Sequence, residues 1–467
     1  MSDKVIRFGG SNAGNASSIK NLIEYLSQFQ SRNFIVSSAV PELLQIVENN
    51  ITQVYKSETG EVARQFELVF YNNTGESPTQ GYQNLVEQYS NILKGIGLIG
   101  DYSEALSDQV KSFSEKLTVE ILKTQFQKSG VAITIIWPED YEFFVTPDFG
   151  NATYLSVSSS KLQSLSGGVY LIPGSFGITK QGKIARAGKT AADYTAAFLT
   201  YALKIPKLQL WGLDFDFQRA DPAIVPGSPR IERLTYAEAS ELAYFDHYSF
   251  HPRTVEPLEH DHIPIEVLNS STTSGRIDTV INTETYIENQ IVKSVACTDD
   301  ISLLRLNGPG VGLKPGILAK VTSGLNDAGI NIKSVITSQV SINLILEKSA
   351  ADEALKIMQQ PGFSSVKEIS IVKNVSLIGV VGHGMQQNYG VSARIFNAVS
   401  QGKINVLLSG SGASDLVSYL VVKDEDKEKS VRHTPLIRWR GRGRISALPT
   451  SMRWLLSSPL WAIEAWG

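Results

Sequence analysis

The chain has 467 residues, of which 42% are hydrophobic and 19% charged, and its net charge at pH 7 is −3. At roughly 150 residues per domain this length favours about three domains, and the composition excludes a disordered chain. The near-neutral charge predicts no nucleic-acid partner, the single cysteine excludes an internal disulfide, and no apolar run reaches the ~20 residues that span a bilayer. The N-terminus lacks a signal-peptide pattern, so we expect a cytoplasmic protein without a membrane partner.

From residue 1 to about 290, short β-branched runs alternate with longer helical patterns. Strands are predicted at 5–8, 34–36, 132–136 and 208–211, and helices at 17–28 and 191–203. This alternation predicts an α/β sandwich around a mostly parallel sheet. Ligands of such sheets bind beyond the carboxyl ends of the strands, which is where the glycine turns of this chain fall.

After residue 295 the pattern changes to a βαββα order that occurs twice. The first copy has strands at 301–306, 332–336 and 340–346 and helices at 315–326 and 350–358; the second has strands at 377–381, 404–408 and 417–422 and a helix at 392–400. The second copy lacks the closing helix, which should begin near 427 and run past 432. The repeat predicts two related units of roughly 70 residues each.

The tail at 433–467 differs from the rest of the chain in composition. It holds four of the six tryptophans and five arginines, but no lysine or aspartate. One interpretation is a basic and aromatic segment for a membrane or a nucleic acid. Because glycines and prolines break the helical spacing that an amphipathic anchor needs, we instead interpret the tail as the product of an altered reading frame.

The first strand leads into a glycine turn that reads Val5-Ile6-Arg7-Phe8-Gly9-Gly10-Ser11-Asn12. Adjacent glycines after a strand let backbone N–H groups approach an anion, and the following helix presents its positive end. The segment resembles the Lys-Phe-Gly-Gly-Thr-Ser opening of aspartokinases. Arg7 stands where that family has a phosphate-binding lysine, and Ser11 where it has threonine. Arginine keeps the charge but not the compact geometry of lysine.

Three further segments resemble the substrate side of aspartokinases. Ser38, in Val36-Ser37-Ser38-Ala39, matches a serine at a strand end that faces the substrate, although an ordinary strand-to-loop serine would look the same. Glu115, in Ser112-Phe113-Ser114-Glu115-Lys116-Leu117, matches a glutamate that faces the substrate's amino group; without the resemblance it reads as a solvated helix carboxylate. Thr146, in Thr146-Pro147-Asp148-Phe149-Gly150, looks like part of a substrate loop.

The stretch from Gly174 to Asp193 resembles the family's Gly-Phe-Ile-Gly and Leu-Gly-Arg-Gly-Gly-Ser-Asp-Tyr-Ser-Ala segments. Asp193 is retained, Lys189 replaces the arginine, and the Gly-Gly-Ser is absent. The resemblance implies that Arg7, Lys189 and Asp193 carry catalysis and that Lys189 also contacts the substrate. The stretch is not a P-loop, because five residues rather than four separate its two glycines.

The nucleotide segment of aspartokinases reads Trp-Thr-Asp-Val-x-Gly-Val-Tyr-x-x-Asp-Pro-Arg, and here it corresponds to residues 211–223. The Thr-Asp pair becomes Gly212-Leu213, and a further lysine of the family, in Gly-Ala-Lys, becomes Tyr248. His251, in a segment that matches well, is interpreted as a packed structural histidine. The resemblance implies contacts with ATP and its phosphates at Arg7, Gly9, Gly10, Ser11, Trp211, Asp216 and Asp221.

The first repeat unit resembles the effector-sensing ACT domain of aspartokinases through residues 311–319 and 331–341. Backbone N–H groups at such a helix start suit the carboxylate of an amino acid, although an ordinary glycine-rich loop is the alternative. Gln339 replaces the family's usual acid. The resemblance implies a lysine or threonine effector held by Leu313, Gly316, Ile317, Ser338 and Gln339. Because a single ACT sheet leaves open edges, we expect a homodimer formed through the ACT units.

The resemblance covers about residues 4–432 and implies three domains. These are an amino-acid-kinase-type αβα sandwich at 1–295 and two ferredoxin-like ACT domains at 296–372 and 373–432, the second incomplete. The implied reaction is transfer of the ATP γ-phosphoryl group to the β-carboxylate of L-aspartate, the first step of lysine, threonine and methionine biosynthesis. Mg²⁺ accompanies ATP, and no residue is assigned as a metal ligand.

The losses in the nucleotide segment leave a second hypothesis open. The chain could be a catalytically silent homologue that binds an amino acid through its ACT units and regulates a partner. A different acceptor, such as glutamate or carbamate, is disfavoured by the pair of ACT units.

Overall fold

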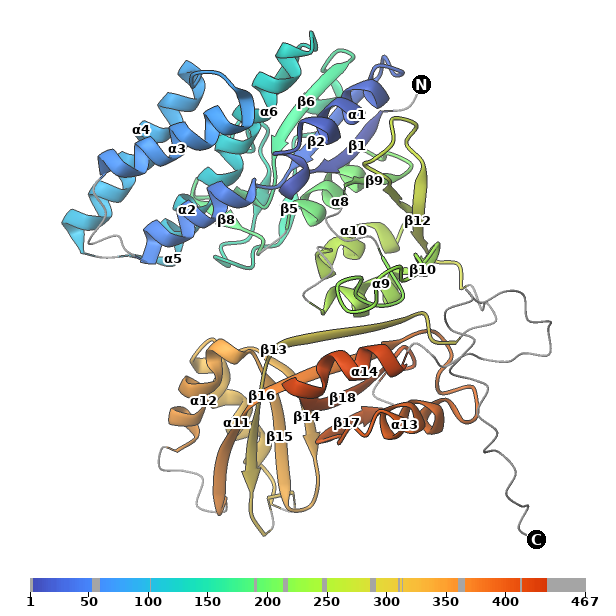
Figure 1. The fold of residues 1–467 in the computed structure, drawn as a ribbon. Coiled ribbons are helices and arrows are strands. Elements are labelled where there is room, and N and C mark those ends of the chain that lie inside the picture. The colour runs from blue at the N-terminus through green and yellow to red at the C-terminus, as the bar shows by residue number, and fades with distance from the viewer. Residues whose placement is uncertain are drawn as a thin grey trace, which may run out of the picture.

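The structure is a computed structural model of the chain. It describes residues 3–52, 59–100, 102–188, 191–212, 217–245, 250–285, 291–309, 311–312, 314–359, 366–411 and 414–434. An N-terminal part, coloured blue to yellow-green in Figure 1, shares a hydrophobic core with a C-terminal part, coloured olive to red. The long strand β13 (Ser294–Asn307) lies on the side of the C-terminal part that faces the N-terminal part (Figure 1).

The N-terminal part is built on an eight-stranded sheet. Its order is β10 (Arg233–Thr235), β12 (Ile277–Asn282), β11 (Ile265–Leu268), β9 (Leu208–Trp211), β1 (Lys4–Phe8), β2 (Arg32–Ser37), β6 (Gly168–Pro173) and β3 (Ile133–Ile135). Every neighbouring pair is parallel except β11 with β12. The prediction of a mostly parallel sheet is confirmed.

The central strands end at one level. Phe8 pairs with Ser37 of β2 and with Trp211 of β9, so Gly9, Ser38 and Gly212 follow side by side at the carboxyl edge of the sheet. The strands are almost wholly buried, as expected of a parallel sheet covered on both faces. The register therefore brings the predicted phosphate turn and the predicted substrate serine together.

Helices cover both faces of this sheet, which makes the predicted αβα sandwich. One core joins the sheet to α1 (Ala16–Leu26), α2 (Pro41–Thr52), α3 (Thr59–Thr74), α4 (Gln80–Ile99) and α6 (Phe113–Lys128); the other joins it to α8 (Ala192–Ala202), α9 (Tyr236–Ala243) and α10 (Glu256–Glu259). Side chains alternate between the faces of a strand, so Ile6 and Phe8 enter the first core and Val5 the second. Arg7 shares the face of Val5 and points toward α8.

A small four-stranded sheet stands beside the main one. It has the order β5 (Tyr154–Ser156), β4 (Phe144–Val145), β7 (Phe176–Ile178) and β8 (Ile184–Arg186). The short helices α5 (Glu104–Lys111) and α7 (Ser159–Gln163) complete this region. Through β8 it contributes Arg186 to the candidate site.

The C-terminal part is one antiparallel sheet shared by both repeat units. Its order is β14 (Ile332–Thr337), β15 (Ser341–Leu346), β13, β16 (Glu368–Val381), β18 (Val417–Lys423) and β17 (Leu408–Ser411). Four helices, α11 (Ile317–Asp327), α12 (Ala351–Met358), α13 (Val391–Gln401) and α14 (Lys427–His433), pack on it. The two long strands β13 and β16 pair along their whole length, with irregularities near Ile301.

Because β13 passes through both units, the units are interleaved rather than consecutive. Residues 294–298 pair with 377–381, beside β18, while residues 302–307 pair with β15. Val295 and Cys297 pack in the core of the second unit, whereas Leu304 and Leu306 pack in the core of the first. The start of β13 therefore completes the second unit. The sequence pattern, which indicates two successive blocks, did not predict this.

Two expectations for the second unit are wrong. The strand expected at 404–408 begins only at Leu408, because Lys403 has a left-handed φ of 52° and Ile404 donates its N–H to the Val399 carbonyl oxygen. Ile404 thus closes helix α13 as the apolar residue of a helix-ending motif. The closing helix, expected to be missing, is present as α14, whose Val431 is fully buried.

The tail interpretation falls almost wholly outside the described residues, which end at Thr434. Thr434 itself is buried and its hydroxyl donates to the Ser430 carbonyl oxygen, so the second unit extends past 432. None of the helices within the described ranges is long and apolar enough to cross a membrane.

Candidate functional site

A buried ion pair stands at the carboxyl edge of the main sheet. Nε of Arg7, near the end of β1, lies 2.6 Å from Oδ1 of Asp193 in the first turn of α8. Arg7 is 2% exposed and Asp193 is fully buried. Oδ2 of Asp193 accepts a hydrogen bond from the His251 backbone N–H at 3.2 Å. The structure thus joins two of the three residues predicted to carry catalysis; the third, Lys189, lies outside the described residues.

Opposing effects act on the Asp193 carboxyl. Burial raises its pKa, while the Arg7 guanidinium and the hydrogen bond from His251 act to lower it. A buried carboxylate beside a buried guanidinium compensates its charge, so the pair costs far less than either ion would alone. Arg7 is therefore held in place by Asp193.

The glycine turn packs directly on the end of β2. A side chain at position 9 would overlap Oγ of Ser38, so only glycine allows this approach. Gly10 has a φ of 65°, in the left-handed region, and Ser11 is exposed. Oγ of Ser38 is buried and has no hydrogen-bond partner among the described residues. An unsatisfied buried hydroxyl beside a glycine turn is suited to a ligand.

The expected positive end of helix α1 is already partly occupied. The Asn15 side chain accepts hydrogen bonds from the N–H groups of Ser17, at 2.9 Å, and Ser18, at 3.1 Å. This cap satisfies two of the N–H groups that a helix start leaves free. An anion at this edge would therefore depend on the turn at residues 9–12 more than on α1.

A second buried ion pair lies on the substrate side. Nη2 of Arg186, at the end of β8, donates to Oε1 of Glu115 at 3.1 Å, and the Ser114 hydroxyl donates to Oε2 at 2.9 Å. Glu115 is 2% exposed, which excludes the alternative of a solvated helix carboxylate. Nε of Arg186 is buried without a partner among the described residues. Sequence reasoning missed Arg186, because only the fold brings it to Glu115.

Asp108, also missed, fixes the loops around this second pair. Its Oδ2 accepts hydrogen bonds from the N–H groups of Gly150 and Arg186, both at 2.7 Å. Burial raises the pKa of Asp108, and these two N–H groups act to lower it. The predicted substrate residue Thr146 accepts from the Thr153 N–H at 3.0 Å within the same loop. An aspartate on an amphipathic helix normally reads as solvated, so the sequence carried no signal for this role.

His251 is a packed histidine, as interpreted. It is 7% exposed, its ring stacks on Tyr194 with centroids 5.9 Å apart, and its Nδ1 accepts the Arg253 N–H at 3.2 Å. Burial, reinforced by the Arg253 charge, lowers its pKa to about 4, so the ring is neutral near pH 7.

The residues predicted to contact the nucleotide lie in different surroundings. The side chain of Trp211 is fully buried in the core, 5.0 Å from the Tyr25 ring, so only its backbone could meet a nucleotide, and that contact stays a prediction. Asp221 accepts the Ala223 N–H at 2.9 Å in a local turn, and its neighbour Ala220 packs in the core of the second ACT-like unit. Asp216 and Leu213 lie outside the described residues.

The predicted effector residues surround one loop of the first repeat unit. Gly316 has a φ of 86° at the start of α11, and Ile317 packs against the core. The Gly312 N–H donates to the Gln339 carbonyl oxygen at 3.0 Å, and Ser338 accepts the Ser341 N–H at 3.1 Å. The loop before α11 and the turn between β14 and β15 therefore meet; Leu313 lies outside the described residues.

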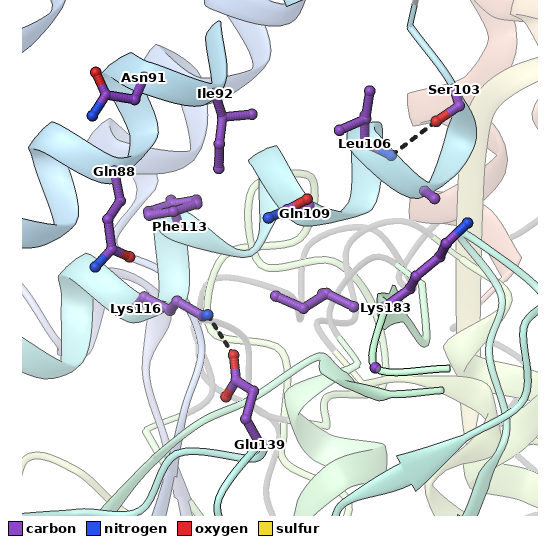
Figure 2. A pocket seen from close by; sticks show the side chains of 13 residues that line it. Gln88, Asn91, Ile92, Ser103, Leu106, Gln109, Phe113, Lys116, Glu139 and Lys183 are labelled. Carbon is purple, nitrogen blue, oxygen red and sulfur yellow. Dashed lines mark hydrogen bonds and ion pairs between the residues drawn. The ribbon is translucent and has the colours of Figure 1, made fainter. Parts of the chain in front are cut away.

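A separate cavity of about 680 Å³ opens between α4, α5, α6 and the turn before β8 (Figure 2). Lys116 and Glu139 line it and form an ion pair, with Nζ 2.6 Å from Oε1, and Lys183 projects from the turn. None of the four residues of the two buried ion pairs lines it. In the described ranges, no group of three histidine, cysteine, aspartate or glutamate side chains could hold a metal ion.

Comparison with known proteins finds relatives for the N-terminal part and for both repeat units. The amino acid kinase family model matches residues 4–269, and ACT domain models match residues 296–360 and 378–434. Aspartokinase 2 of Arabidopsis thaliana chloroplasts is 27% identical over 452 residues, which cover 92% of this chain and 82% of that protein. The bifunctional aspartokinase/homoserine dehydrogenase of Buchnera aphidicola is 25% identical over 455 residues, or 92% of this chain. The chain spans only 56% of the length of that bifunctional relative.

Solved structures agree on the fold. Escherichia coli aspartokinase III in complex with aspartate and ADP has a TM-score of 0.79 at 21% identity and covers 93% of this chain and 100% of that one. The same enzyme in complex with lysine and aspartate has a TM-score of 0.69 at 21% identity, covering 91% and 97%. The chain belongs to the amino acid kinase family, carries two ACT domains, and has aspartokinases as its relatives in both sequence and fold.

Proposed function

We propose that the chain is an aspartokinase-type phosphotransferase that uses ATP to phosphorylate the β-carboxylate of L-aspartate. The observation that carries the proposal is the Arg7–Asp193 pair, fixed beside Gly9 and Ser38 at the carboxyl edge of the sheet. A guanidinium at this place faces the edge where parallel sheets bind ligands and can neutralise phosphate charge.

The proposed phosphoryl transfer needs no general acid or base from the protein. An oxygen of the acceptor carboxylate, ionised at neutral pH, forms the new bond to the γ-phosphorus. The bond to the oxygen that bridges the β- and γ-phosphates breaks, and ADP leaves with the electron pair. No proton moves, so Asp193 is needed to hold Arg7 rather than to act as a base. Arg7 stabilises charge on the transferred group, while Glu115, Arg186 and Ser38 line the acceptor side.

Mg²⁺ supplies charge neutralisation when bound to the phosphates of ATP. The carboxylates of the two buried pairs, Asp193 and Glu115, are oxygen ligands of the kind Mg²⁺ prefers, but each already lies against an arginine. These residues favour an ion that enters with the nucleotide over one that the protein holds by itself.

A second function is that of a catalytically silent regulator that binds an amino acid. It is favoured by the charge compensation within the two buried ion pairs. The described site has two buried cations, and each is compensated by a buried carboxylate. A cation that already lies against a carboxylate attracts the phosphates of ATP less strongly than an unpaired cation would. The contact between the Gly312 loop and the turn at Ser338 supports an amino-acid effector, lysine or threonine, in either function. The cytoplasmic location remains a prediction.

The deciding experiment measures hydroxamate formation from aspartate and ATP. Turnover of about 1–100 per second supports the kinase, and Arg7→Met should then lower it roughly 100-fold or more. The matched control is Lys183→Met, an exposed lysine outside both ion pairs, which should leave turnover unchanged. No turnover, combined with amino-acid binding by calorimetry, would refute the kinase and support the regulator.

A further inference from the structure

Two departures from the aspartokinase pattern meet in space. Asn12 stands at the last position of the Lys-Phe-Gly-Gly-Thr-Ser segment, where the family has serine, and Gly212 stands where the nucleotide segment has threonine. Although 200 residues separate them, Nδ2 of Asn12 donates to the Gly212 carbonyl oxygen. One position has gained a larger side chain and the other has lost its side chain.

The Asn12 carboxamide occupies the space that a side chain at 212 would enter. A Cβ on Gly212 would lie 2.6 Å from Cγ, 2.7 Å from Oδ1 and 2.8 Å from Nδ2 of Asn12. Real Cβ atoms do not approach heavy atoms so closely, so the Asn12 side chain and any side chain at 212 exclude each other. Gly212 also has a φ of 65°, which disfavours a β-branched residue in the present backbone.

Asn12 also joins three elements of the candidate site by hydrogen bonds. It is 8% exposed, and its Oδ1 accepts from the Ser18 hydroxyl at 3.1 Å, in the first turn of α1. Its amide reaches Gly212, directly after the last residue of β9. Asn12 itself ends the short helical turn Gly10–Asn12 that follows Gly9. One buried side chain therefore holds the predicted phosphate turn between α1 and the end of β9.

We propose that Asn12 and Gly212 form one compensating exchange, and that Asn12 is a positioning residue for the phosphate-binding turn. This proposal rests on the proposed nucleotide-dependent function. The loss of threonine at 212 then does not by itself impair the site. Glycine leaves space for the Asn12 carboxamide, which fixes the position of the turn. Asn12 acts on the nucleotide through the backbone of residues 9–12.

The exchange is tested by a double-mutant cycle on folding, which needs no ligand. Gly212→Ala should lower the urea midpoint of unfolding by more than Gly227→Ala does, and Asn12→Ser should remove that excess by opening the space, leaving only the strain of alanine at a φ of 65°. Gly212→Thr with Asn12→Ser, the family's own pair, should lose less of the urea midpoint than Gly212→Thr alone, and the loss that remains is the strain of a β-branched residue at a positive φ. The matched control is Gly227→Ala, because Gly227 has a φ of 74° and no atom within 4 Å of a built Cβ. Equal losses from Gly212→Ala with and without Asn12→Ser would overturn the exchange.

The positioning role is tested by calorimetric titration with MgATP. Asn12→Ala should weaken MgATP binding roughly tenfold, the effect of one buried hydrogen bond, and raise the KM for ATP while kcat changes less. The pair Asn12→Ser with Gly212→Thr should bind MgATP more tightly than Gly212→Thr alone. Unchanged affinity in Asn12→Ala, or no binding by the wild-type chain, would overturn the role. Intact MgATP binding without aspartate phosphorylation would instead count only against the proposed reaction.

Discussion

Nη2 of Arg186 lies 3.1 Å from Oε1 of Glu115, so the carboxylate matched to the substrate's amino group already has a cation beside it. Both side chains are at least nine-tenths buried. A substrate ammonium would approach Glu115 next to a like charge, while a substrate carboxylate would meet Arg186. The pair therefore offers one partner to each end of an amino acid and no net charge.

We expect Arg186→Met to destabilise the protein by about 3–5 kcal/mol, because it leaves the buried Glu115 carboxylate without its cation. Removing both charges, in Arg186→Met with Glu115→Gln, should recover much of this loss. Urea unfolding measures both. The control is Lys161→Met, which breaks the half-exposed pair of Lys161 with Glu142 and should cost no more than about 1 kcal/mol. A loss from Arg186→Met as small as that of the control would contradict the prediction.

Acid should weaken the fold through His251. Its pKa is about 4 in the folded protein and 6.5 in the unfolded chain, so between these values the unfolded chain binds the extra proton. The stabilisation is fully present above pH 6.5 and is lost as the pH falls toward 4, up to about 3 kcal/mol.

His251→Asn, which keeps an acceptor for the Arg253 N–H, should flatten the pH dependence of the urea midpoint across that window. His260→Asn is the control, because the His260 side chain is 91% exposed. The same slope in wild type and His251→Asn would rule this explanation out.

Patterns of local spacing predicted most of the fold. The strand at 208–211 and the helix at 191–203 are found at β9 and α8 within one residue or so, because their apolar runs agree with the burial that the sheet imposes. The prediction of a strand that begins at Ile404 was wrong, because in the sequence an apolar residue after a helix looks the same whether it caps that helix or begins a strand. Only the left-handed Lys403 tells them apart, and its φ is not written in the sequence.

The site was predictable where a residue's role follows from its place at a strand end, and not where it follows from a distant partner. Arg7, Gly9 and Ser38 come together because the parallel strands β1 and β2 end at one level. Arg186 finds Glu115 across 71 residues, and Asn12 finds Gly212 across 200. The burial of the Trp211 side chain was not predictable, because an aromatic residue in a motif can serve either a ligand or the core.

We expect a homodimer formed through the ACT sheet. The sheet ends at β14 and β17, and two apolar side chains of the first unit are exposed, Val335 of β14 at 37% and Leu318 of α11 at 41%. Unpaired strand edges with apolar side chains favour association. Light scattering at micromolar concentration should report a dimer that Val335→Glu weakens. Leu98→Glu, at an 89% exposed position on α4, should leave it intact, and a wild-type monomer would count against the prediction.

The last prediction concerns the joint between the kinase domain and the ACT sheet. Phe245, just after α9, is fully buried and packs on Gly379 of β16, where a Cβ would overlap the ring and lie 2.6 Å from Cε2. Beside it, the Tyr419 hydroxyl of β18 donates to Oε2 of Glu241 at 2.9 Å. Gly379→Ala should therefore force the two domains apart, although alanine suits a strand better than glycine does.

Thermal unfolding should show the separation. We expect Gly379→Ala to split a single transition into two, and Phe245→Leu to restore one transition by making room for the added methyl group. Gly410→Ala, in β17 of the same sheet, is the control, because its Cβ would meet only the tip of Ile336 at 3.3 Å. Phe245 is followed in the sequence by Tyr248, which stands in place of the family's nucleotide-site lysine. Gly379→Ala should therefore also weaken any effect of an amino acid bound to the ACT domains on ATP binding. An unchanged single transition in Gly379→Ala would show that this contact does not hold the domains together.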